Sequence, residues 1–222
     1  VKSNIETMLE LEGDLIPYYY DISLDQGWGI MAYLHQEPAD AGNMMMSLVE
    51  TESFIIMKNS QGDVFWPTLE LNTIGNMEPG EGYQIKLTES ILFSYPNIDG
   101  SRYRDTYVET PIYFESPVKT GNNMIIGLPL NAWESTPSIG DEIGAYGLDG
   151  ILIGSSIFQG ENLALTIWGD DLTTDNKDGL SEGEKISFRL WSPQTGIEQI
   201  LEVRWEEGVG FYTVDGISIA GQ

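Results

Sequence analysis

Residues 161–191, ENLALTIWGDDLTTDNKDGLSEGEKISFRLW, place two strand-like runs on either side of an acidic loop. The runs ENLALTIW and KISFRLW alternate apolar residues with polar ones, which is the period-two pattern of a β-strand. The loop between Trp168 and Trp191 carries these carboxylates: Asp170, Asp171, Asp175, Asp178, Glu182 and Glu184. The stretch therefore predicts two strands joined by a loop that a sheet holds at both ends.

The same pattern of short strand-like runs and turns extends through the second half of the chain. Short apolar runs such as NNMIIGLPL, GDEIGAY, GILIGSSIF and VGFYTVDGISI are separated by turn-forming residues. Regular spacing of short strands and turns is typical of a β-sandwich or barrel. We expect the second half to fold in this way.

The first half predicts strands and one helix. YYYDISL and GWGIMAYL have strand character, and residues 38–50, PADAGNMMMSLVE, form the helix candidate. Pro38 and Asp40 suit its first turn, while Met45, Leu48 and Val49 give an apolar stripe at helical spacing.

Glycines mark the predicted turns. The runs SFIIMKN and VFWPTLEL flank Gln61-Gly62-Asp63, which predicts a hairpin with Gly62 at positive φ. We expect the same backbone freedom to explain further glycines, namely Gly75, Gly80, Gly82, Gly140 and Gly179.

These patterns predict an all-β protein of two β-sandwich-like domains, with one short helix in the first. We divide the chain into residues 1–16, a linker or leading strand, residues 17–105, the first β module, and residues 106–222, the second. The polar, turn-rich stretch at 95–111 places this boundary.

Composition excludes several classes of function. The 222 residues include 10 basic and 35 acidic ones, for a net charge of -25, and 41% are hydrophobic. Nucleic-acid binding needs clustered Lys and Arg, which this chain lacks. No apolar run approaches the roughly 18 residues of a membrane helix, so we expect no membrane insertion. With no cysteine, disulfides and thiol catalysis are excluded.

The acidic loop is a candidate calcium site, because Ca²⁺ accepts about six to eight oxygen ligands in flexible geometry. It is not an EF-hand: with Gly179 on the glycine of D-x-[DN]-x-[DN]-G-x5-E, Thr174 and Lys185 fall on the two terminal ligand positions. The alternative is a solvated acidic turn. The expected ligands are Asp170, Asp171, Asp175 and Asp178, assisted by Asn176 or Glu184.

Catalytic patterns are weak. The only histidine, His35, lacks a G-x-S-x-G elbow, and zinc would need Cys and His ligands. A glycosidase needs only two carboxylates, but the acidic residues here lie in turns and short loops rather than in long pocket-forming insertions. We therefore expect no enzyme activity.

Aromatic residues offer a second kind of site. Sugar rings stack on exposed aromatic faces, and Trp133 and Tyr18–Tyr20 lie outside the strongest apolar runs. The other tryptophans lie within or beside apolar strands, where we expect them to pack in the core.

Unpaired edge strands offer a third possibility, self-assembly by strand addition. YYYDISL and VGFYTVDGISI are the segments expected to take part.

Two blocks of motifs cover most of residues 26–191. The first has a Gly-Trp opening strand, an apolar helix, an I-x-x-K-x-x-x-G-x-x-[YW]-x-P hairpin and an N-x-I-G-x-x-x-P-G-x-G-Y-x-[IV]-K block. This chain matches it at Gly27, Trp28, Lys58, Gly62, Trp66, Pro67, Asn72, Ile74, Gly75, Pro79, Gly80, Gly82, Tyr83 and Lys86. The second has G-D-E-I-G-x-[FY], W-G-D-D, a D-G turn and G-E-x-I-x-F-x-[LI]-W. On these motifs the two blocks resemble paired β-rich modules of large secreted and cell-surface proteins of Bacteroidota.

The resemblance implies a stalk, adhesion or accessory module and carries no activity over to named residues. We therefore expect a non-enzymatic adhesion or structural module, extracellular or on the cell surface, that calcium stabilises and that can self-assemble. Its partners would be neighbouring modules of the same or a like chain, or surface glycans. The alternative is a carbohydrate-binding module of a secreted multidomain protein.

Overall fold

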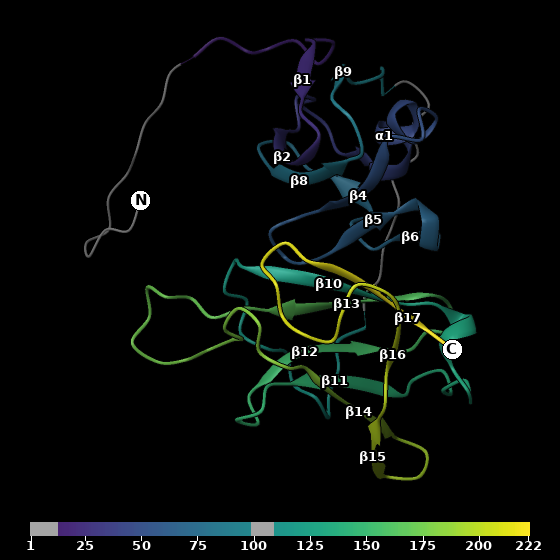
Figure 1. Cartoon of the computed structure of the whole chain (residues 1–222). Coiled ribbons are helices and arrows are strands. Elements are labelled where there is room, and N and C mark those ends of the chain that lie inside the picture. Colours follow the sequence, from purple (N-terminus) through teal and green to yellow (C-terminus); the bar gives the residue numbers. More distant parts are fainter. Residues whose placement is uncertain (1–12, 99–108) are drawn as a thin grey trace.

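A computed structural model of the chain describes residues 13–98 and 109–222 (Figure 1). Strands dominate these ranges, and their single α-helix has nine residues. The all-β, multi-sheet prediction with one short helix is confirmed. No helix in the described ranges has the length and apolar character needed to cross a membrane.

The first domain is built on a five-stranded antiparallel sheet of order β2-β8-β4-β5-β6, with two-stranded ribbons β1-β9 and β3-β7 beside it. Its strands are β1 (Ile22–Leu24), β2 (Gly27–Ala32), β3 (Ala39–Asp40), β4 (Phe54–Lys58), β5 (Val64–Trp66), β6 (Leu71–Asn72), β7 (Asn76–Met77), β8 (Gly82–Leu87) and β9 (Ile91–Phe93). A short 3₁₀ helix, η1 (Pro67–Leu69), joins β5 to β6.

The predicted helix is α1 (Ala41–Val49), which begins later than the sequence pattern suggested. Asp40 caps it by accepting a hydrogen bond from the Asn43 backbone N–H, as polar N-cap residues do. Ala39–Asp40 pair with β7, so the placement of Pro38 and Asp40 inside the first turn was wrong. Met45 and Leu48 are buried against the sheet, as predicted.

The hairpin prediction at Gln61–Asp63 is confirmed: β4 and β5 pair antiparallel, and Gly62 has φ 88°. Of the other glycines, Gly75, Gly80 and Gly140 have positive φ. Gly82 and Gly179 do not, so conformational freedom does not explain them. Gly82 begins β8.

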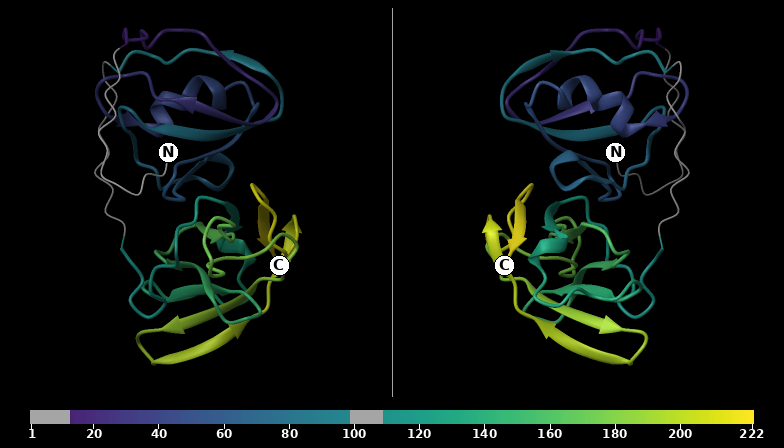
Figure 2. Two further views of the ribbon diagram at one scale, coloured as in Figure 1. Left: turned by 90° about the vertical axis from the view of Figure 1, so that its left-hand side faces the viewer. Right: turned by 90° about the vertical axis from the view of Figure 1, so that its right-hand side faces the viewer.

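The second domain is a sandwich of two four-stranded sheets, β13-β10-β17-β16 and β12-β11-β14-β15. Its strands are β10 (Asn123–Leu128), β11 (Glu142–Tyr146), β12 (Leu152–Ile157), β13 (Leu163–Trp168), β14 (Ser187–Ser192), β15 (Ile197–Leu201), β16 (Arg204–Glu207) and β17 (Ile217–Gly221). Among the strand pairs of residues 13–98 and 109–222, only β10 and β17 run parallel. The β14–β15 hairpin lies at the end of the sandwich away from the first domain (Figures 1 and 2).

Strand β10 contributes to two cores, which explains its apolar run from Met124 to Leu128. All six of its residues are buried. Met124, Ile126 and Leu128 face the sandwich interior, while Ile125 belongs to a third cluster shared with the first domain. The first-domain members of this interface cluster are Ile56, Val64, Trp66, Leu69 and Leu71.

The structure bears on the predicted chain start, domain boundary and edge strands to different degrees. Residues 13–16 form no strand, residues 1–12 lie outside the described part, and so does the proposed boundary at 105/106. The segments expected to add strands are already paired: β1 pairs with β9, and β17 lies inside its sheet between β10 and β16. Strand addition at β17 is therefore wrong, because both of its edges are occupied.

Candidate functional site

The most unusual polar site lies between the domains, where Lys58 at the end of β4 enters the interface with 1% of its surface exposed. Its Nζ donates to Asp215 Oδ1 at 2.7 Å and to Asn123 Oδ1 at 2.8 Å. Asn123, the first residue of β10, is 3% exposed. A buried amine, a carboxamide and a carboxylate thus meet at one point.

Lys58, Asn123 and Asp215 form what we call the interdomain cluster, and Trp28 of β2 covers it. Its ring centroid lies 4.7 Å from Lys58 Nζ, and its Nε1–H donates to the Asp215 backbone oxygen at 2.9 Å. Asp215 has φ 58°, a conformation that non-glycine residues adopt at a cost. Burial lowers the pKa of Lys58, and the hydrogen bond to Asp215 opposes this effect.

The acidic loop is closed by backbone contacts at its base. Gly169 bridges to Leu180, and the Asp170 N–H donates to the Leu180 oxygen at 2.9 Å. A Cβ on Gly179 would collide with the backbone of Gly169, so Gly179 is needed for this close approach. Gly179 was singled out in the sequence as a turn residue, but the structure requires glycine there for this close chain contact and not for a turn conformation.

The structure brings some predicted ligands together. The Asp178 N–H donates to Asp170 Oδ1 at 2.9 Å, and the Asp171 N–H donates to Asp178 Oδ1 at 3.0 Å. Asp175 and Asn176 are exposed on the loop. Within the described ranges, no group of three or more His, Cys, Asp or Glu side chains is arranged to hold a metal ion.

Lys177 occupies the space beside the last predicted ligand, Glu184. Its Nζ lies 2.8 Å from Glu184 Oε2 and 2.7 Å from Asp149 Oδ2. The Lys177 ammonium lowers the pKa of Asp149, and the two carboxylates raise the pKa of Lys177. The chain thus supplies its own cation at this side of the loop, which the count of carboxylates did not reveal.

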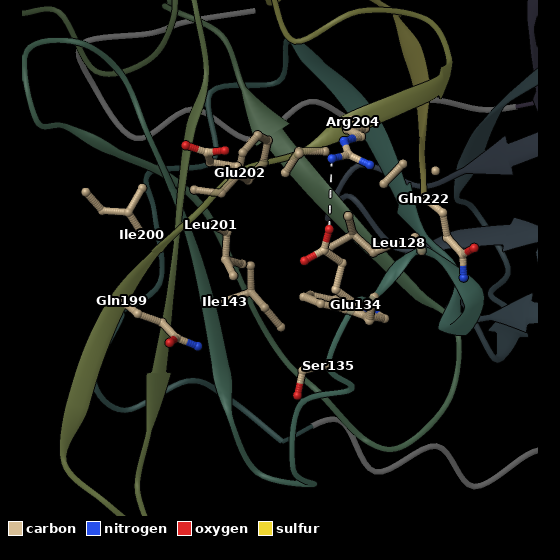
Figure 3. A pocket seen from close by; sticks show the side chains of 16 residues that line it. Leu128, Glu134, Ser135, Ile143, Gln199, Ile200, Leu201, Glu202, Arg204 and Gln222 are labelled. Atoms are coloured by element: carbon tan, nitrogen blue, oxygen red, sulfur yellow. Dashed lines mark ion pairs between the residues drawn. The ribbon is translucent and has the colours of Figure 1, made fainter.

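The predicted sugar-stacking residues lie in different domains. Trp133 is half-buried and packs edge-on to Phe158, so the expectation of an exposed ring was wrong. Its Nε1 is enclosed and has no hydrogen-bond partner among residues 13–98 and 109–222. It lines a pocket of about 450 Å³ at one end of the sandwich, with Leu128, Ile143 and Leu201 inside (Figure 3). The pair formed by Glu134 and Arg204, 4.0 Å apart, lies across it (Figure 3).

Tyr18, Tyr19 and Tyr20 belong to the first domain. The expectation of an exposed ring was wrong for Tyr18, which is half-buried and stacks on His35 with ring centroids 4.4 Å apart. His35 is 5% exposed and its Nε2 lies 2.8 Å from the Pro96 oxygen, which fits a structural role. Tyr19 and Tyr20 are exposed, as predicted.

The expectation that Trp191 packs in the core was wrong, because it is half-buried and forms a flat aromatic pair with Tyr113 that was missed in the sequence. Tyr113 lies parallel to Trp191 on the outer face of β14, with centroids 4.5 Å apart and an interplanar angle of 1°. The Tyr113 hydroxyl donates to Glu198, and Arg189 lies over the ring of Tyr146 on the same face. Alternation along SFRLW places Trp191 opposite the buried Leu190, so strand period could have identified the outward ring.

Comparison with known proteins gives no family for this chain. No family model matches it, and neither a curated protein nor a solved structure matches it.

Proposed function

We propose that this chain is a non-enzymatic structural or adhesion module of an extracellular or cell-surface protein, in which two β domains work as one rigid spacer. The observation that carries the proposal is the interface cluster, in which first-domain side chains pack against Ile125 of β10. Domains move relative to each other by default unless their interface is large and hydrophobic. The interface cluster is apolar, and β4, β5, β6, η1 and β10 all contribute to it.

Polar contacts around the interface cluster support a fixed arrangement. Thr166 Oγ1 donates to the Gly62 oxygen at 2.6 Å, and Asn162 Nδ2 donates to the Leu69 oxygen at 2.9 Å. These hydrogen bonds fix the relative orientation of the two domains as well as their separation, because hydrogen bonds weaken when they are misaligned. A module held in this way would transmit force without bending at its middle.

Calorimetry and small-angle scattering of the whole chain test the spacer. We expect one cooperative unfolding transition and a scattering profile that one fixed arrangement fits. Leu69→Glu should separate the transition into two, because it places a charge in the interface cluster, whereas Ile30→Glu, at a side chain 76% exposed, should not. Two independent transitions in the unmodified chain would refute the rigid spacer.

Carbohydrate binding is the second candidate, and the Tyr113–Trp191 pair favours it. A planar, partly exposed aromatic surface next to Arg189 and Glu198 offers both stacking and hydrogen bonding to a sugar. A glycan array with the unmodified chain, Tyr113→Ala and Trp133→Ala separates the possibilities. Signal lost only with Tyr113→Ala would support this face, whereas an array without signal would leave the spacer as the better proposal.

Like modules are the proposed protein partners, and β15 is the best edge for them. It is the outer strand of its sheet, and Ile197 and Ile200 are 62% and 79% exposed. Exposed apolar edge strands favour pairing with another chain. Size-exclusion chromatography of Ile200→Lys against the unmodified chain tests this partner: a concentration-dependent dimer should be lost in the variant.

Calcium remains an accessory part of the proposal. What supports it is the close approach of Asp170 and Asp178 and a net charge of -25, which concentrates cations at the surface. Glu184 can contribute only if Lys177 leaves it.

A further inference from the structure

The interdomain cluster holds three groups with complementary chemistry. Lys58 supplies an amine, Asn123 an amide carbonyl and Asp215 a carboxylate, and both Asn123 and Asp215 accept a hydrogen bond from the same Nζ. The side chains of Lys58 and Asn123 are almost fully removed from water. An ion pair with Lys58 would require only Asp215. A purely electrostatic role for the cluster therefore does not explain why the Asn123 amide is buried beside the amine.

We propose that Lys58 and Asn123 react to form an isopeptide bond that joins the two domains covalently, with Asp215 as the catalytic carboxylate. The Lys58 Nζ attacks Cγ of Asn123. A new Nζ–Cγ bond forms, the Cγ–Nδ2 bond breaks, and the side-chain nitrogen leaves as ammonia. Starting from the charged amine, the products are a neutral amide and an ammonium ion, so charge and atoms balance without an oxidant or cofactor.

Asp215 has a defined task in this reaction. Its Oδ1 lies 2.7 Å from Nζ, within the reach required of a general base, and takes the proton that the amine must lose. It then delivers a proton to the departing nitrogen of Asn123. The Asp215 side chain is 31% exposed, which places this group at the solvent edge of an otherwise buried site and gives the ammonia a way out.

The positions suit attack on the carbonyl carbon. Nζ lies 2.8 Å from Asn123 Oδ1, and the carbonyl carbon is about 1.2 Å from that oxygen. The Nζ–Cγ separation is therefore below about 4 Å, and attack requires the amine to move from the carbonyl oxygen toward Cγ until the two atoms are roughly 3–3.5 Å apart. β4 and β10 hold the two side chains there, so that little further ordering is needed.

The surroundings favour a reactive amine. Burial in an apolar site disfavours the charged ammonium, which activates lysine nucleophiles. The Trp28 ring covers Nζ and anchors the Asp215 backbone through its Nε1–H. Lys86, whose Nζ lies 5.4 Å from the same ring, adds a second positive charge that further opposes protonation of Lys58.

Such a bond would do in this chain what a disulfide does elsewhere. It would connect residues 65 positions apart and restrict the unfolded chain, in a protein that has no cysteine. The inference goes beyond the proposed spacer role, because a covalent bond is present or absent whatever the module does.

Intact mass spectrometry of the purified whole chain under denaturing conditions is the test. We expect a mass lower than that of the sequence by one ammonia, and a protease digest containing a branched peptide that joins Lys58 to Asn123. Full mass in the folded chain would overturn the proposal. Loss of ammonia without that branched peptide would overturn it too, because an asparagine can also lose ammonia by cyclising on its own backbone.

Variants separate the roles of the three groups. Lys58→Met removes the nucleophile and Asp215→Gly removes the carboxylate while suiting the positive φ at that position, so both should keep the full mass. Circular dichroism establishes that each is folded, and Asp215→Gly serves if Lys58→Met does not fold. Lys119→Met is the control, because Lys119 donates to Gln61 and lies outside the cluster, and this variant should still lose one ammonia. A branched peptide in folded Asp215→Gly would refute the role of Asp215.

Discussion

Gly127 of β10 and Leu69 of η1 meet across the domain interface so closely that a side chain at position 127 would have to displace Leu69. A Cβ on Gly127 would lie 2.5 Å from Leu69 Cδ1 and 3.1 Å from the ring of Trp66. The backbone of Gly127 does not have a positive φ, so alanine could adopt its conformation without strain. The glycine is thus required by contact between domains and not by its own conformation.

Gly127→Ala should therefore weaken the interface without disturbing the strand. Overpacking a tight apolar contact costs roughly 1–3 kcal/mol, and we expect the free energy of unfolding to fall by about that amount. Urea denaturation followed by tryptophan fluorescence measures the change. Gly29→Ala is the matched control, because a Cβ there meets nothing within 4 Å. Equal stability of the two variants would show that the interface yields without cost.

The base of the acidic loop gives a second prediction of this kind. Gly179→Ala would drive a methyl group into the backbone of Gly169, which cannot move aside as a flexible side chain can. We expect a loss of roughly 1–3 kcal/mol in the free energy of unfolding and faster hydrogen exchange at the Leu180 N–H, which donates to the Trp168 oxygen. Unchanged exchange at Leu180 would contradict the role given to this contact.

Local patterns foretold much of this fold because the interactions behind them are local. The β4–β5 hairpin, the α1 stripe and the alternating strands each follow from neighbours in sequence. The parallel pairing of β10 with β17 could not be predicted in this way, since strand order depends on distant packing. The double burial of β10 was visible only as an unusually apolar run, without the identity of its second partner.

The interdomain cluster was invisible to sequence reasoning for the same reason. Lys58 and Asp215 are 157 positions apart, and neither lies in a local pattern that points to the other. For the acidic loop, the sequence showed which carboxylates are present but not which hydrogen bonds and ion pairs they form. Asp149, which holds Lys177, lies 28 positions away in another turn.

Alkaline pH should destabilise the protein through its buried tyrosines. Burial raises the pKa of Tyr212 to about 12 and also raises the pKa of Tyr33 and of Tyr95. The folded state then retains protons that the unfolded state releases above about pH 10. The stabilisation is complete below that pH and is lost as the pH rises toward 12, by roughly 1–3 kcal/mol. Urea denaturation at about pH 9 and about pH 11 measures the loss.

Tyr212→Phe tests how much one buried tyrosine hydroxyl contributes to this pH dependence. The Tyr212 hydroxyl is buried without a hydrogen-bond partner among the described residues, so removing it should leave the protein equally or more stable at neutral pH. The variant should also lose less stability at alkaline pH than the unmodified chain. Tyr20→Phe, at a ring 57% exposed, is the control and should leave the neutral stability within about 0.5 kcal/mol. A strongly destabilised Tyr212→Phe would mean that the hydroxyl has a partner such as water.

Lys177→Gln tests whether the acidic loop binds calcium. The change removes the cation that Asp149 and Glu184 share and frees both carboxylates from their ion pair with Lys177. A ligand that binds only the folded state raises its stability with concentration, so calcium should raise the melting temperature more in Lys177→Gln than in the unmodified chain. Lys119→Gln is the control for charge alone, because Lys119 contacts Gln61. If neither chain responds to calcium beyond its response to equal ionic strength of sodium chloride, the loop is a solvated turn neutralised by Lys177.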